Sequence, residues 1–177
     1  MKLVILDRDG VINQDSPEFI KSPQEWKPIP GSLEAIARLT QWGYRVVVAT
    51  NQSGVARGLF DMDTLCAIHD KMVRAVSEAG GRIDAIFYCP HAEDDRCACR
   101  KPRDGMLREI GARYGTGLDA VPVIGDGLRD IEAAVAAGAQ PILVLTGKGE
   151  TTRLDPRLPG GIRIFPDLAA AAAALTA

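Results

Sequence analysis

The amino-acid sequence predicts an α/β fold, a Rossmann-like doubly wound parallel sheet with helices on both faces. Five short apolar runs, each ending in a polar loop, have the length and composition of strands that are buried on both sides. Helical patterns separate these runs, and the expected C-terminal stops of four helices are Gly43, Gly80, Gly115 and Gly138. Because strand and helix alternate, we expect parallel strands joined by right-handed crossovers.

The expected elements follow one another along the chain. Strands are predicted at residues 3–6, 45–49, 85–88, 121–124 and 142–145. Helices are predicted at residues 33–42, 62–79, 106–114, 130–137 and 168–175. In the second helix, Cys66 and His69 share the spacing of its apolar residues, so we expect both in the core. Residues 146–161 are expected to form a long, mobile loop.

Composition and charge narrow the class of protein. A chain of 177 residues fits a single domain, residues 1–177, and its content of 46% hydrophobic and 25% charged residues is typical of a globular protein. The formal charge of -2 gives no basic field for nucleic acid, and no apolar segment has the length of a signal peptide or a membrane span. We therefore expect a cytoplasmic monomer that binds a small molecule, with neither nucleic acid nor a membrane as partner.

Two carboxylates directly follow the first strand, in the segment Asp7-Arg8-Asp9-Gly10. A turn at Gly10 can bring both side chains to one pocket, at the strand ends where open parallel sheets bind ligands. One carboxylate could then attack phosphorus while the other moves the proton of the leaving group. The alternative is that Asp7 and Asp9 only accept hydrogen bonds from loop amides.

Three further segments offer groups for binding phosphate and metal. Residues 50–54 follow the second strand and supply hydroxyl and amide donors, although an ordinary polar turn would look similar. Arg100 and Lys101 supply two cations, a pair that is otherwise usual on a solvated surface. Asp126 follows the fourth strand and suits Mg²⁺, and Asp130 either belongs to the same site or caps the next helix.

In this order, the motifs Asp-x-Asp-Gly, Thr-Asn, Lys-Pro and Gly-Asp-x-x-x-Asp resemble the haloacid dehalogenase (HAD) superfamily over essentially the whole chain. The resemblance implies a phosphatase with an aspartyl-phosphate intermediate, in which Asp7 is the nucleophile and Asp9 is the general acid and then the base. It also implies Mg²⁺ bound by Asp7, the main-chain carbonyl of Asp9, and Asp126, with Thr50 and Lys101 stabilising the transferred phosphoryl group. Such cations offset the repulsion between an anionic nucleophile and a phosphate.

A loop at residues 89–99 concentrates metal-ligand residues. It contains three thiols and one imidazole, a full tetrahedral set for Zn²⁺, from Cys89, His91, Cys97 and Cys99. With no open coordination position, the zinc is expected to be structural. In a reducing cytosol, clustered cysteines are more often metal ligands than disulfides, and the alternative is a group of reduced surface cysteines.

The gaps between the motifs are too short for a cap domain, so the resemblance implies a capless enzyme with an open site. Residues 50–58 and 105–107 are similar to heptose bisphosphate phosphatases of the superfamily. This similarity implies removal of the 7-phosphate of a heptose 1,7-bisphosphate, in the synthesis of ADP-heptose precursors for lipopolysaccharide or other surface glycans. The candidate substrate-binding residues for this sugar bisphosphate are Arg8, Asn51, Gln52, Ser53, Arg57 and Arg100. The alternatives are a histidinol-phosphate phosphatase and a zinc-stabilised binding module without catalytic activity.

Overall fold

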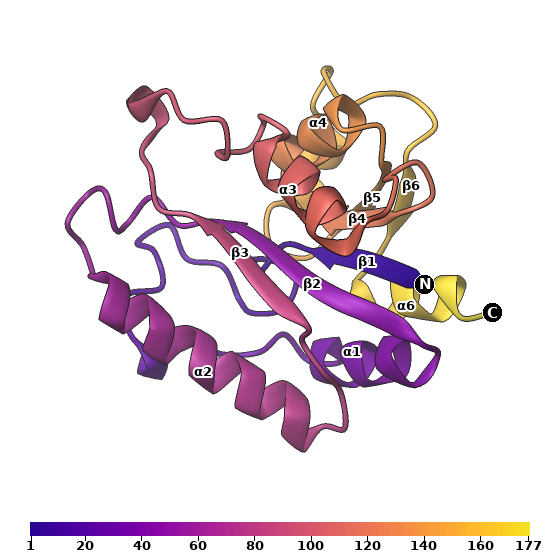
Figure 1. Cartoon of the computed structure of the whole chain (residues 1–177), viewed down its shortest axis with the longest axis horizontal. Helices are drawn as coiled ribbons and strands as arrows, with labels where there is room; N and C mark the ends of the chain where they lie inside the picture. The colour runs from indigo at the N-terminus through magenta and orange to yellow at the C-terminus, as the bar shows by residue number, and fades with distance from the viewer.

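A computed structural model describes residues 1–177 and contains one six-stranded sheet with helices on both faces (Figure 1). The strand order is β3-β2-β1-β4-β5-β6, and every neighbouring pair is parallel. The strands are β1 Lys2–Leu6, β2 Tyr44–Asn51, β3 Ala85–Cys89, β4 Pro122–Gly125, β5 Gln140–Val144 and β6 Arg163–Phe165. The predicted doubly wound parallel sheet is confirmed.

Six α-helices connect and cover the strands. They are α1 Ser32–Gln41, α2 Met62–Glu78, α3 Gly105–Tyr114, α4 Leu128–Ala136, α5 Gly149–Arg153 and α6 Leu168–Leu175, with short 3₁₀ turns at Pro23–Glu25 and Glu93–Asp95. The four glycines predicted to end helices have φ between 60° and 88°, a range that glycine adopts without steric cost. None of the helices is both long and apolar enough to cross a membrane.

Side chains that alternate along the strands divide the core into two layers. In β1, Val4 and Leu6 pack in the layer that contains α1, α2 and α6, whereas Leu3 and Ile5 pack in the layer that contains α3 and α4. Figure 1 shows these two groups of helices on opposite sides of the sheet. Because both faces are covered, the central strands are apolar at nearly every position, as in other parallel sheets.

In the C-terminal third of the chain, one prediction was wrong and one strand was missed. Residues 146–161 are not one irregular loop, because they contain α5, where Thr152 is buried and its hydroxyl donates a hydrogen bond to the carbonyl of Asp126. The strand β6 was not predicted at all. It has three residues at the edge of the sheet, two of them exposed, so it has no apolar run that would mark it.

On α2, the core prediction is confirmed for His69 and is wrong for Cys66. His69 is buried with Leu65, Ile68, Met72 and Val76, whereas Cys66 is exposed. Successive residues of a helix are rotated by about 100°, so Cys66 falls at the margin of the stripe that its neighbours define.

The direction of winding reverses at β1. The chain runs from β1 to β2 and β3 on one side, whereas β4, β5 and β6 lie on the other side. At the reversal, the amide of Asp7 donates a hydrogen bond of 2.9 Å to the carbonyl of Ile124, which joins the carboxyl ends of β1 and β4. Ligands of open α/β sheets bind at such a reversal.

Candidate active site

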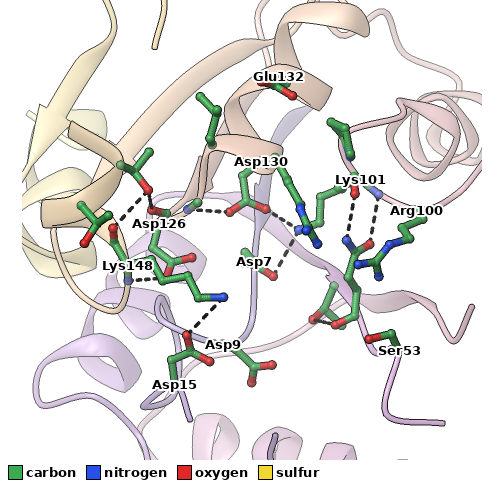
Figure 2. Close-up of a pocket in the computed structure, with 18 of the residues that line it drawn as sticks. Asp7, Asp9, Asp15, Ser53, Arg100, Lys101, Asp126, Asp130, Glu132 and Lys148 are labelled. Carbon is green, nitrogen blue, oxygen red and sulfur yellow. Dashed lines mark hydrogen bonds and ion pairs between the residues drawn. The ribbon is translucent and has the colours of Figure 1, made fainter. Parts of the chain in front are cut away.

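A pocket of about 710 Å³ opens at the carboxyl ends of β1, β2 and β4. Its lining is almost entirely polar and includes Asp7, Asp9, Thr50, Lys101 and Asp126, which come from four separate segments of the sequence. Figure 2 shows Asp7 at the centre, with Asp126 to its left, Asp130 above it and Lys101 to its upper right. The structure therefore brings together the residues that the four sequence motifs predicted.

Asp7 lies at the end of β1 between a cation and several carboxylates. Its Oδ1 accepts a hydrogen bond of 2.8 Å from the amide of Arg8 and lies 3.2 Å from Nζ of Lys101. Burial and the negative charge of Asp130 raise the pKa of Asp7 well above its ordinary value, and Lys101 only partly opposes them. A carboxylate in these surroundings favours the approach of a cation.

Asp9 is held by a dense set of donors. Nε and Nη2 of Arg8 donate to its Oδ1 at 3.0 and 2.8 Å, and the Asn13 amide donates to the same oxygen at 2.9 Å. Its Oδ2 accepts one bond, of 3.2 Å, from the amide of Gln52. Burial alone would raise the pKa of Asp9, but the Arg8 guanidinium and these hydrogen bonds outweigh it and lower the pKa below its ordinary value.

The placement of Arg8 contradicts its prediction as a substrate-binding residue. Its side chain is fully buried and does not line the pocket. The guanidinium is directed at Asp9 and at Nε2 of His69, which lies 3.1 Å from Nη1. Arg8 therefore contacts Asp9 from outside the pocket. Its place in the sequence, between Asp7 and Asp9, did not reveal this position.

Lys101 is buried, and its ammonium group contacts two acidic side chains. Nζ lies 2.5 Å from Asp130, donates to the carbonyl of Ala49 at 2.8 Å and lies 3.2 Å from Asp7. Burial alone would lower the pKa of Lys101, but Asp130 and Asp7 raise it above its ordinary value, so the side chain stays cationic. Asn51 fixes the same residue from β2, because its side-chain amide bonds both the N–H and the carbonyl of Lys101 at 3.1 Å.

Asp126 is fixed by the segment that follows β5. The amide of Lys148 donates to its Oδ2 at 2.8 Å. A Cβ atom added to Gly10 or Gly147 would lie 2.0 or 2.2 Å from that oxygen, so the backbone can pass only because both residues are glycine. Burial and Asp130 raise the pKa of Asp126 to about 7.

Three clustered carboxylates fit a hard divalent cation. Oxygen atoms of Asp7, Asp126 and Asp130 lie within 4.8 Å of one another, and oxygen donors are the ligands that Mg²⁺ prefers. Burial and, after it, the charge of Asp130 raise the pKa values of both Asp7 and Asp126, so a bound cation would favour the charged form of each. The sequence left the role of Asp130 open. In the structure Asp130 belongs to this cluster, its Oδ1 contacts Nζ of Lys101, and its Oδ2 accepts a hydrogen bond from the Gly127 amide.

The remaining predicted binding residues have different surroundings. Thr50 is buried at the pocket wall and accepts a hydrogen bond of 3.0 Å from Gln52, whose amide also reaches Asp9. Ser53 and Arg100 line the pocket, and Nη1 of Arg100 is buried without a hydrogen-bond partner. Arg57 lines an adjoining hollow formed by the turn Glu93–Asp95 and lies over the ring of Phe19.

Several lining residues were not predicted from the sequence. Arg129, Thr152 and Arg157 line the pocket. Thr152 and Arg157 belong to the segment that was expected to be a mobile loop. Their position after β5, beside the carboxyl end of β4, is the signal that could have found them.

The residues predicted to bind zinc form one cluster next to the pocket. The Sγ atom of Cys89 lies 3.6 Å from that of Cys97, and Nδ1 of His91 lies 3.5 Å from Cys89 and 3.4 Å from Cys99. These separations match the ~3.5–3.8 Å edges of a tetrahedron with zinc ligand bonds of ~2.0–2.3 Å. Only the Sγ atoms of Cys89 and Cys99 are closer, at 2.9 Å, and all four cysteines of the chain are free thiols.

The cluster also contacts the segment that carries Arg100. Burial would raise the pKa of Cys97, but the main-chain amide of Arg100 and the neighbouring thiols and imidazole lower it to about 6. A thiol with this pKa is readily available as a thiolate ligand. The donor set and its geometry thus fit a metal ion.

Comparison with known proteins agrees with this geometry. A family model described as polynucleotide kinase 3 phosphatase matches residues 2–125, and one described as HAD-hydrolase-like matches residues 98–171. The D-glycero-beta-D-manno-heptose-1,7-bisphosphate 7-phosphatase of Bordetella bronchiseptica is 62% identical over 172 residues, which are 97% of this chain and 96% of that protein. The protein of the same name from Pseudomonas aeruginosa is 56% identical, over 98% of this chain and 97% of its own length.

A solved structure gives the same result. The crystal structure of D,D-heptose 1,7-bisphosphate phosphatase from B. bronchiseptica, complexed with magnesium and phosphate, matches with a TM-score of 0.97 and 61% identity. The match covers 99% of this chain and 98% of that chain. This chain belongs to the family of D-glycero-beta-D-manno-heptose-1,7-bisphosphate 7-phosphatases, within the HAD-like hydrolases.

Proposed function

We propose that this protein is a Mg²⁺-dependent phosphatase that removes the 7-phosphate of D-glycero-β-D-manno-heptose 1,7-bisphosphate. The observation that carries the proposal is the contact of Asp7 with Lys101 at the edge of a carboxylate cluster, inside a pocket lined by cations. A carboxylate beside a fixed ammonium can meet a phosphate without prohibitive repulsion. The names of the relatives support the substrate and its β anomer.

In the proposed reaction, a carboxylate oxygen of Asp7 attacks phosphorus and the bond from phosphorus to the sugar oxygen breaks. Lys101 and Thr50 stabilise charge on the phosphoryl oxygens, and Mg²⁺ held by Asp7, Asp126 and the Asp9 main-chain carbonyl would withdraw further negative charge. Asp9 gives its proton to the departing sugar oxygen. It then accepts a proton from the water that attacks the phospho-aspartate, which releases inorganic phosphate and restores Asp7.

Asp9 must be protonated before the first step, although donors lower its pKa in the free protein. A phosphate dianion that enters beside Asp9 disfavours the carboxylate and raises that pKa. Asp9 is therefore expected to take up its proton as the substrate binds. The low pKa of the free state suits the second step, in which Asp9 is the base.

A second phosphate would bind to the arginines at the mouth of the pocket. Arg100 is 7% exposed, and its Nη1 lacks a partner, which is costly for a buried charged group. Burial and the nearby Arg129 guanidinium lower the pKa of Arg100, so the two cations repel each other in the free protein. An anion between them would relieve both costs. Histidinol phosphate, whose far end is cationic, would increase the repulsion instead.

The proposal extends to the zinc loop and to the setting of the enzyme. Zn²⁺ bound by Cys89, His91, Cys97 and Cys99 would be structural, since all four positions are taken by protein ligands. Free thiols clustered in this way suit a reducing compartment and support a cytoplasmic enzyme. All six strands belong to one sheet, which supports a single domain; we propose that this domain is a monomer. The product would serve ADP-heptose synthesis for lipopolysaccharide or other surface glycans.

The test is a substrate screen with Mg²⁺ present and a nucleophile variant as the control. We expect the wild-type protein to hydrolyse the β-heptose bisphosphate far more efficiently than fructose 1,6-bisphosphate or histidinol phosphate. The Asp7→Asn variant should lose more than about 99% of turnover because an amide is a poor nucleophile. Phosphate release is measured with each substrate and with an aryl phosphate.

Three outcomes would contradict the proposal. A preference for histidinol phosphate would show that the proposed substrate is wrong. Near wild-type turnover by Asp7→Asn would show that Asp7 is not the nucleophile. No release from any ester, including the aryl phosphate, would indicate a binding module without catalytic activity.

A further inference from the structure

A fully buried arginine connects Asp9 to the helix α2. Arg8 has no exposed surface, and each of its three guanidinium nitrogens contacts a polar side chain. Nε and Nη2 bond Oδ1 of Asp9, at 3.0 and 2.8 Å, and Nη1 lies 3.1 Å from Nε2 of His69. His69 is itself 7% exposed and belongs to the buried face of α2. The chain of contacts thus runs from α2 through Arg8 to a carboxylate of the pocket.

The chemistry of arginine fixes the direction of the contact with His69. A guanidinium has only donors, so Nε2 of His69 must accept the hydrogen bond and carry no proton. The imidazole is therefore neutral, with its proton on Nδ1. Burial and the Arg8 charge lower the pKa of His69 to about 3, which agrees with this arrangement. His69 provides Arg8 with an acceptor and adds no charge.

The contacts of the two Asp9 oxygens are unequal. Oδ1 accepts bonds from two nitrogens of Arg8 and from Asn13, whereas Oδ2 accepts only the 3.2 Å bond from Gln52. Oδ1 is thus saturated by donors behind the pocket. The less occupied Oδ2 is left to exchange a proton with a bound molecule.

We propose that His69 is a positioning residue, which holds Arg8 so that Arg8 presents Oδ2 of Asp9 to the leaving group. The proposal rests on the proposed function of Asp9 in proton transfer and adds a residue from a different element to it. Without an acceptor on α2, Nη1 of Arg8 is a buried donor without a partner, and the guanidinium must turn to satisfy it. Asp9 then moves with the guanidinium, because two bonds join them.

The test compares substrates that differ in their need for a proton. A sugar alkoxide must be protonated as it leaves, whereas p-nitrophenolate is a stable anion and leaves without a proton. We expect His69→Leu, which removes the acceptor, to lower kcat/KM for the heptose bisphosphate by at least ~10-fold more than for p-nitrophenyl phosphate. That loss is a fraction of the ~10²–10⁴-fold that a general acid supplies. His69→Gln keeps an acceptor near the position of Nε2 and should restore most of the efficiency.

Two controls separate positioning from a general loss of stability. Ile68→Val shortens a fully buried side chain next to His69 in α2 and should lower the unfolding temperature without a difference between the two substrates. Arg8→Lys keeps the charge but loses the two-nitrogen grip on Asp9, and should show the same substrate difference as His69→Leu. The Arg8→Lys variant also tests the proposal if His69→Leu does not fold.

Each result decides one question. If the wild-type protein hydrolyses the bisphosphate and Asp9→Asn discriminates between the substrates, the proposed function stands and the His69 variants can be judged. Equal losses on both substrates in His69→Leu and Arg8→Lys would then overturn the positioning role, as would a His69→Gln variant no better than His69→Leu. If the wild-type protein releases phosphate from neither substrate, the proposed function has failed first.

Discussion

Lys101 has as many partners as it has protons to donate. Its three N–H groups meet Asp130, the carbonyl of Ala49 and Asp7, with Asp7 the most distant at 3.2 Å. A phosphoryl oxygen that reaches this ammonium must displace one of them, and the longest contact is the easiest to replace. The exchange would release Asp7 from the cation at the moment when phosphorus comes within reach.

At the same scale, Gly10 is predicted to be indispensable for metal binding. The Gly10→Ala variant places a Cβ atom where Oδ2 of Asp126 lies, 2.0 Å away, and φ of +81° adds backbone strain. Displacing a ligand carboxylate should raise the Mg²⁺ concentration that gives half-maximal activity by on the order of 10-fold or more. Activity is measured over a range of Mg²⁺ concentrations.

Gly80→Ala is the matched control. Gly80 has a similar φ of +88°, but an added Cβ meets no atom within 4 Å. This variant should carry the strain alone, with an unchanged Mg²⁺ requirement. Equal Mg²⁺ dependence in the two variants would show that metal binding does not require a glycine at position 10.

At the scale of elements, the loop from β3 to α3 brings its cations to the pocket through two separate supports. Cys99 of the metal cluster directly precedes Arg100, and Asn51 of β2 holds the main chain of Lys101. The first support joins the loop to the end of β3, to which Cys89 belongs, whereas the second ties the loop to β2. Lys101 is thus constrained from both sides, while Arg100 depends mainly on the loop.

Loss of one thiol ligand tests the first support. We expect Cys97→Ser to lose bound zinc and to lower kcat/KM by roughly 10-fold, because the cations are then less well positioned for the transition state. The sheet has its own core, so the far-UV circular dichroism should change little. Zinc content and activity are measured together at saturating Mg²⁺. Full efficiency in a zinc-free variant would show that the loop does not depend on the metal.

At the scale of the whole molecule, the carboxylate cluster is predicted to make stability depend on pH. The pKa of Asp126 is raised from 3.8 to about 7, and that of Asp7 is also raised, so these two groups bind more protons in the folded protein than in the unfolded chain between these values. Without Mg²⁺, their contribution to stability should therefore decrease as pH rises from about 4 to 7, whereas buried His69, whose pKa is lowered to about 3, contributes with the opposite sign over a similar range. Mg²⁺ stabilises the charged carboxylates, so its stabilising effect should increase over the same range.

The measurement is the unfolding temperature at several pH values, with and without Mg²⁺, and without a chelator, which would also remove the zinc that we propose. His69 and Asp9, whose pKa values are lowered, oppose the contribution of Asp7 and Asp126, so the cluster is tested by the difference that Mg²⁺ makes at each pH and not by the slope without Mg²⁺. A Mg²⁺ effect that is the same at pH 5 and pH 8 would contradict the assignment of the cluster as the metal site.

Much of the sheet and of the site could be predicted from the sequence alone. The buried strands were predictable because each is a continuous apolar run, and Asp7, Asp126 and Lys101 because each follows an expected strand or belongs to an ordered motif. Arg8 could not be placed, because the sequence does not reveal which way a side chain leaves a turn. The edge strand β6 and the short helix α5 were missed because neither is long enough to show a period.

The strand order has a consequence for folding during synthesis. β1 lies at the centre of the sheet, yet its two neighbours are β2 and β4, and β4 follows it by more than a hundred residues. A nascent chain can pair β1 with β2 and β3 early, but one apolar edge of β1 stays open until β4 has left the ribosome. Chains arrested before Pro122 are therefore expected to bind chaperones or aggregate, and the phosphatase site can assemble only after that late closure.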